Sequence, residues 1–113
     1  MRYILAICML LCAANIQAEE NRAMLIFSAK WCGPCQRMKN EVFPLLRNEM
    51  RPWKVYRVDI DTHKEVTRKW KVDGVPTIIF VKLVPNNHAV PIRREVGFKS
   101  VRYLRQLLKD LLK

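Results

Sequence analysis

The alternation of apolar and polar residues along the chain predicts the strands of a small sheet. Residues 23–28 form a continuous apolar run, which is typical of a strand buried on both faces. Residues 53–60 alternate in character and residues 77–81 are β-branched and apolar, so both segments are expected to be strands. A turn rich in proline and asparagine then leads to an edge strand near residues 92–96, because Pro91 is tolerated best at an edge.

Helical patterns fill the intervals between these strands. Residues 36–43 have helical character, and Pro44 is expected to break or kink this helix before a second helical piece at residues 45–50. Residues 62–70 are polar and charged, which is typical of a short surface helix. The clearest helix covers residues 101–112, where leucines recur at helical spacing after an N-capping serine. The order β-α-β-α-β-β-α predicts an α/β domain with helices packed on the sheet.

The beginning of the chain has the pattern of an export signal. Arg2 precedes an unbroken apolar run over residues 3–14, and Ala18 offers a cleavage site before a polar segment. The run is shorter than the roughly 20 apolar residues of a membrane span. We therefore expect a signal peptide at residues 1–18 and a single exported domain at residues 19–113, most simply in a periplasm.

Two other fates of this leader stay open. Ile16 is bulkier than the residue preferred near a cleavage site, so the leader can remain as an uncleaved anchor. Cys12 raises the question of lipid modification, which the large Leu11 before it disfavours. Secretion beyond a periplasm also stays open.

The charge of the chain is strongly unbalanced. It carries 21 Lys and Arg against 10 Asp and Glu, a net charge of +11, which attracts nucleic acid, anionic lipid or acidic client proteins. No nucleic-acid module accompanies the charge, so no specific nucleic-acid partner is predicted, and a monomer is expected. The stripe at Arg102, Arg105, Lys109 and Lys113 is interpreted as a solvated helix face. Trp53 and Trp70 are interpreted as packing residues, and His63 and His88 as surface residues.

Two cysteines dominate the candidate chemistry. Removal of the leader leaves Cys32 and Cys35 from the four in the chain. A loop this small is a poor structural staple, so the pair indicates redox chemistry. A helix that begins at the pair, with Pro34 in its first turn, would stabilise the Cys32 thiolate. Cys35 one turn later could attack the mixed disulfide. Trp31 would flank the pair and partly shield it from water.

A zinc site and an inert structural disulfide are the two alternatives to redox chemistry. A zinc site needs about four ligands, whereas the mature chain adds only the distant His63 and His88 to the two cysteines. An inert structural disulfide is disfavoured by the small loop. No metal and no cofactor is therefore predicted.

Two motifs carry a resemblance to a known family. Trp31-Cys32-Gly33-Pro34-Cys35 matches the active-site motif of thioredoxins, and Gly74-Val75-Pro76-Thr77 matches the family's cis-proline element in sequence and order. The resemblance implies a thioredoxin-like fold over roughly residues 23–112. It also implies that Cys32 attacks, that Cys35 resolves, that Pro76 keeps stray ligands off the pair and that the Val75 backbone holds the client.

The chain departs from this family in three places. Ile26 stands where thioredoxin has a buried aspartate that helps to move protons, so Arg57 or Asp59 is a candidate to compensate. Asn40 stands where thioredoxin has a kinking proline, and Pro44 comes later. The opening strand and helix of thioredoxin are expected to have no counterpart. The pattern is closer to exported thioredoxin-like domains than to cytosolic thioredoxin.

The resemblance implies a thiol–disulfide oxidoreductase that reduces disulfides of exported proteins. Its partners would be disulfide-containing clients and a membrane or soluble thiol electron donor. An oxidant or isomerase remains the alternative within this class, because the same fold spans a wide range of potentials. A non-enzymatic binding module with a basic surface is the alternative from another class.

Overall fold

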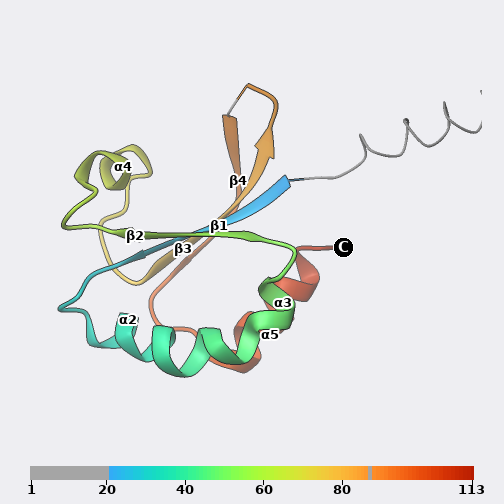
Figure 1. Cartoon of the computed structure of the whole chain (residues 1–113), viewed down its shortest axis with the longest axis horizontal. Coiled ribbons are helices and arrows are strands. Elements are labelled where there is room, and N and C mark those ends of the chain that lie inside the picture. Colours follow the sequence, from blue (N-terminus) through green and yellow to red (C-terminus); the bar gives the residue numbers. More distant parts are fainter. Residues whose placement is uncertain (1–20, 87) are drawn as a thin grey trace, which may run out of the picture.

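A computed structural model describes residues 21–86 and 88–113, so the expected leader lies outside the described residues. A four-stranded sheet in the order β2-β1-β3-β4 forms the centre of the domain (Figure 1). β1 is parallel to β2, and β3 is antiparallel to both β1 and β4. The strands are β1 (Asn21–Ser28), β2 (Lys54–Asp59), β3 (Thr77–Val84) and β4 (His88–Val96).

The helical elements follow the predicted order and confirm the α/β architecture. Figure 1 shows the helical segment from α2 to α3, together with α5, below the sheet, and α4 on the opposite side. Among the described residues, no helix is long and apolar enough to cross a membrane. The elements are α2 (Gly33–Arg37), the π-turn η2 (Met38–Val42), the 3₁₀ turn η3 (Phe43–Leu46), α3 (Arg47–Met50), α4 (Lys64–Lys69) and α5 (Val101–Asp110).

The central strand β1 is buried on both faces, as its apolar run predicts. Met24 and Ile26 belong to the core that packs against α2–α3 and α5, whereas Ala23 and Phe27 belong to the core on the other face. Trp53 is only 4% exposed and meets the Phe80 ring edge-on, at 5.2 Å between centroids. Trp70 packs against the core on the other face. Trp53 and Trp70 are therefore packing residues, as expected.

Pro44 changes the pattern of the helix after the cysteines without ending it. Proline lacks an N–H and its ring clashes with the carbonyl four residues earlier, here that of Asn40. The chain relieves this clash by widening: the Phe43 amide donates to Met38, five residues back, in the π-turn η2. A tighter 3₁₀ turn follows before α3 begins at Arg47. The predicted kink is therefore present as a change of helix type.

Helix α5 starts where the sequence predicts and is attached to α3. The Ser100 hydroxyl accepts a hydrogen bond from the Tyr103 amide at 3.2 Å, which caps the helix. Arg105 donates to Glu49 at 3.0 Å and to the Leu45 carbonyl at 3.1 Å. The interpretation of the whole basic stripe as a solvated face is therefore wrong for Arg105, because this side chain fastens α5 to α3.

Candidate functional site

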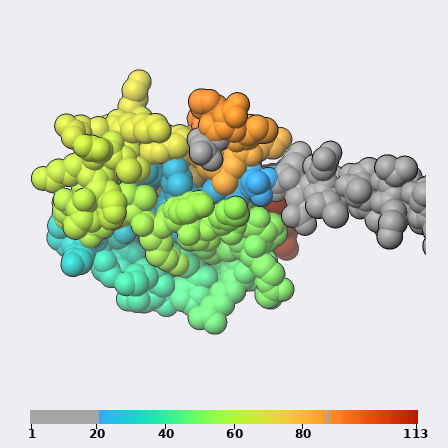
Figure 2. Space-filling model, turned by 45° about the horizontal axis from the view of Figure 1, so that its top comes forward, coloured from blue at the N-terminus to red at the C-terminus, as the bar shows by residue number. Residues whose placement is uncertain are grey.

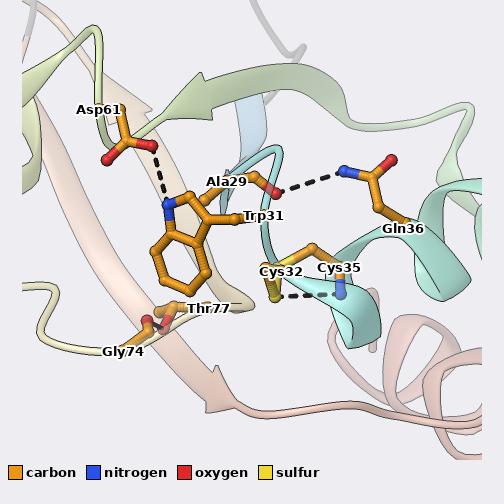
Figure 3. Close-up of a disulfide and its surroundings, with 8 residues drawn as sticks. All are labelled: Ala29, Trp31, Cys32, Cys35, Gln36, Asp61, Gly74 and Thr77. Carbon is orange, nitrogen blue, oxygen red and sulfur yellow. Dashed lines mark hydrogen bonds between the residues drawn. A yellow bond between two sulfur atoms is a disulfide. The ribbon is translucent and has the colours of Figure 1, made fainter.

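Cys32 and Cys35 form a disulfide at the start of the helical segment (Figure 3). Their Cα atoms are 5.2 Å apart, and Cys32 is the N-cap residue of α2. The Cys32 sulfur accepts a hydrogen bond from the Cys35 amide at 3.2 Å. This amide belongs to the first helical turn, where backbone N–H groups have no acceptor within the helix. Pro34 lies in the first turn of the helix as predicted, where its missing N–H costs nothing.

The pair is shielded from water, but not mainly by the residue that the sequence singled out. Cys32 is 5% exposed and Cys35 is 4% exposed. Ala29, Ile60 and Val75 supply the apolar contacts around them. Trp31 is itself 69% exposed, so the expected shielding falls largely to these three side chains.

The indole of Trp31 is held by residues from the end of β2. Its Nε1 donates to the Asp61 carboxylate at 2.9 Å (Figure 3). The Asp61 amide in turn donates to Asp59 Oδ1 at 2.9 Å. On the other side of the cysteines, Gln36 Nε2 donates to the Ala29 carbonyl at 3.3 Å. Nothing in the sequence singles out Asp61 and Gln36, because neither belongs to a motif and Asp61 is 30 residues from its partner.

The second predicted motif lies next to the cysteines. The Val75–Pro76 peptide bond is cis, which confirms the expectation drawn from the resemblance. The Gly97 amide donates to the Pro76 carbonyl at 2.8 Å, and Gly97 has a φ of 91°, a conformation that favours glycine. Val75 contacts the cluster of the cysteines, whereas its role in holding a client stays a prediction.

Gly33 is not required by its surroundings. A Cβ atom built at Gly33 would meet no atom within 4 Å, and the same is true at Gly74. A side chain at either position would therefore meet no steric obstacle.

A cavity of about 220 Å³ is lined by Cys35 and by Ile26, which stands where thioredoxin has its buried aspartate. Arg57 and Asp59, the two candidates to compensate for that aspartate, also line it. The parallel register pairs Ile26 with Arg57 and Ser28 with Asp59, which brings both β2 side chains to this cavity. Ile26 is 3% exposed and lies in the core, as expected. Among the described residues that line the cavity, Asp59 is the only carboxylate.

No cluster of metal ligands accompanies this site. Within residues 21–86 and 88–113, no three His, Cys, Asp or Glu side chains come together to hold an ion. His63 is exposed, and its ring nitrogen Nδ1 lies 2.9 Å from the Thr62 hydroxyl. His88 is exposed at the start of β4. The two histidines are therefore surface residues, as interpreted from the sequence.

Comparison with known proteins identifies thioredoxins as relatives of this chain. The family model "Thioredoxin" matches residues 12–109. Thioredoxin-1 of Drosophila melanogaster is 35% identical over 65 residues, which span 58% of this chain and 61% of that protein. Thioredoxin of Mycoplasmoides gallisepticum is 26% identical over 95 residues, which span 84% of this chain and 89% of that protein. The chain thus spans about three fifths of the Drosophila relative's length.

Solved structures give the same result. Thioredoxin-2 of the malaria parasite, described as a component of its protein secretion machinery, has a TM-score of 0.68 at 30% identity, over 80% of this chain and 84% of that one. Trichomonas vaginalis thioredoxin has a TM-score of 0.69 at 23% identity, over 87% of this chain and 86% of that one, which concerns the fold alone. With the family model covering most of the chain and the cysteine pair in place, this chain belongs to the thioredoxin family.

Proposed function

We propose that this protein reduces disulfides in exported proteins by exchange through Cys32 and Cys35. The observation that carries the activity is the Cys32–Cys35 disulfide at the beginning of a helical segment. The finer parts of the proposal, the reducing direction and the exported clients, are supported by the Gly-Pro pair between the cysteines and by the leader pattern at residues 1–18.

The first step is attack by the Cys32 thiolate on one sulfur of the client disulfide. The client S–S bond breaks, one client thiolate leaves, and a mixed disulfide joins Cys32 to the client. The Cys35 amide and the helix dipole favour negative charge on the Cys32 sulfur before the attack. Gly33, next to Cys32 in the chain, adds no side chain that would hinder the client at this sulfur.

The second step is attack by Cys35 on the Cys32 sulfur. The mixed disulfide breaks, the second client thiolate leaves, and the Cys32–Cys35 disulfide forms, so two electrons pass to the client. Cys35 must first lose its thiol proton. Asp59 is placed to accept it through the cavity, whose volume of about 220 Å³ exceeds the share of several waters at about 30 Å³ each. The proton then passes to solvent, and the released client thiolate takes one up.

The reduction potential of the Cys32–Cys35 pair tests the direction of this exchange. Equilibration of the purified protein with defined thiol buffers is expected to give a value near about −270 mV, the potential known for thioredoxin itself. A value between about −180 and −120 mV contradicts the proposed direction and identifies an oxidant or isomerase. Cys32→Ser and Cys35→Ser together should abolish the activity, whereas a retained cellular function would favour a binding module.

The site of action has its own test. If the leader directs export and is cleaved after Ala18, the protein recovered from the envelope or medium begins at Glu19 by mass spectrometry. A full-length chain in the membrane fraction supports the uncleaved anchor instead, and full-length protein in the cytosol contradicts export.

A further inference from the structure

A groove on the side of the domain carries an unusual concentration of positive charge. It has a volume of about 540 Å³ and lies between the helical segment of residues 39–51 and strand β2. Figure 2 shows the face of the molecule on which these segments, coloured teal to green, lie. We call it the basic groove and define it by the four cations that line it, Lys39, Arg47, Arg51 and Arg57.

The four cations of the groove have no ion-pair partner among the described residues, although Asp59 lines the adjoining cavity with two of them, Lys39 and Arg57. Among the described residues, no carboxylate lines the groove and none forms an ion pair with any of its four cations. The two acids of the same helical segment are paired outside it, Glu41 with Arg37 at 3.6 Å and Glu49 with Arg105 at 3.0 Å. Four like charges around one hollow repel one another, so an anionic partner would be favoured there.

The floor of the groove distinguishes between classes of anion. Phe43, Met50 and Val55 give it an apolar base that fits an aliphatic side chain. The Arg57 guanidinium lies over the Phe43 ring at 5.5 Å from the centroid, which covers the ring face that a nucleic-acid base would need for stacking. The large apolar side chains that line the groove are buried or half-buried, so none of them protrudes to enter a bilayer. The chemistry therefore favours an acidic polypeptide.

The groove is continuous with the redox site. The cavity behind Cys35 and the basic groove share Lys39, Phe43 and Arg57 among their lining residues. A chain that lies in the groove therefore meets residues that also line the cavity at Cys35. Carboxylates on alternate residues of an extended chain are about 7 Å apart on one side, a spacing that suits several cations along one groove.

We propose that the basic groove binds an extended acidic segment of the client, adjacent in the client to the disulfide that is reduced. This inference rests on the proposed function, because it assigns the substrate class of the same redox site. The groove supplies affinity and selectivity through charge and one apolar contact, while Cys32 and Cys35 carry out the exchange.

Direct binding tests the groove without relying on redox chemistry. The probe is a fluorescein-labelled peptide with glutamates at alternate positions and one leucine, titrated with the oxidised full chain and followed by anisotropy. Arg47→Gln with Arg51→Gln should weaken binding about tenfold, as expected for the loss of two exposed ion pairs. The control is Arg68→Gln with Lys69→Gln on α4, which removes the same charge at exposed positions and should leave the dissociation constant within about twofold.

Turnover then tests the link to the client. Two cystine peptides are compared, one with this acidic segment beside the disulfide and one with glutamine in place of glutamate. The wild-type protein should prefer the acidic peptide about tenfold in kcat/KM, and the Arg47→Gln, Arg51→Gln variant should lose the preference. Reduction of the uncharged bis(2-hydroxyethyl) disulfide should be unchanged in this variant, since neither arginine contacts the cysteines.

Three outcomes would overturn the proposal. Equal weakening by the groove and α4 variants would show that only net charge acts. Tighter binding of a single-stranded oligonucleotide or of anionic lipid vesicles would assign the groove to another partner. Peptide binding without any selectivity in turnover would separate the groove from the redox site. Absence of turnover with every disulfide would instead refute the proposed function, and the anisotropy result would still stand.

Discussion

Replacement of Asp59 by asparagine tests how Cys35 loses its proton. Asparagine keeps the Oδ1 acceptor, so the hydrogen bond from the Asp61 amide at 2.9 Å can persist. We therefore expect the free energy of unfolding to change by less than about 0.5 kcal/mol. Asparagine cannot accept the thiol proton, however, so the variant removes the only carboxylate among the described residues that line the cavity behind Cys35.

The size of the expected effect follows from the geometry. A directly positioned acid or base contributes about 10²- to 10⁴-fold to a rate. Here the proton crosses cavity water between Cys35 and Asp59, so we expect about a tenfold slower resolution step. Removal of the negative charge acts in the opposite direction, because it eases ionisation of the neighbouring thiol. The loss should therefore be greatest near neutral pH and vanish at high pH, where the thiol ionises without help.

Stopped-flow absorbance separates this step from the first one. Reduced protein is mixed with excess of a chromophoric aromatic disulfide, so that release of the second aromatic thiolate reports attack by Cys35. The control is Asp73→Asn, which removes one negative charge at an exposed position away from the cavity. If the Asp59→Asn and Asp73→Asn variants follow the wild-type rate from about pH 6 to pH 9, Asp59 takes no part in the proton transfer.

Three further predictions concern stability and the site. Lys71 has a φ of 53° just after α4, so Lys71→Gly should raise the free energy of unfolding by about 0.5–1 kcal/mol in urea titrations, and no gain would contradict a strained residue there. The pKa of Glu49 is lowered from its ordinary value of 4.5, chiefly by a hydrogen bond to its own backbone. Desolvation opposes this shift, and the hydrogen bond and charge of Arg105 add to it. The stabilisation by ionised Glu49 is fully present above pH 4.5 and is lost as the pH falls through the lower pKa of the folded state. The urea midpoint of Glu49→Gln should therefore decrease less than that of the wild type as the pH is lowered. Trp31→Phe removes the hydrogen bond to Asp61 at 2.9 Å and should slow client reduction while the urea midpoint changes little, because the indole is exposed; a large drop in midpoint would show that Trp31 is structural.

The elements that depend on local sequence were predicted correctly. The apolar run of β1, the cap of α5 at Ser100 and the helix start at Pro34 each depend on neighbouring residues, and each lies where expected. Pro44 predicts an interruption of the regular helix, because its missing N–H is a local property. The sequence could not give the response of the helix, since a π-turn is only one of several ways to relieve the clash.

Other parts of the site depend on residues that are distant in the chain. Asp61 holds Trp31 only because the end of β2 lies beside the end of β1, which no motif records. The basic groove is equally invisible in the sequence, because Arg57 reaches it from a strand and Arg47 from a helix. The spacing of Arg105 predicts a solvated side chain on an exposed helix face, whereas Glu49 lies within its reach in the folded chain.

The sequence by itself determined the chemistry of this protein. Two cysteines with Gly-Pro between them at the start of a helix, followed by the Val75-Pro76 element, are enough for disulfide exchange, because nucleophile and resolving thiol are neighbours in the chain. The tertiary structure decided what surrounds that chemistry. The parallel register of β1 and β2 brings Arg57 and Asp59 behind Cys35, and only strand pairing across distant parts of the chain sets that register.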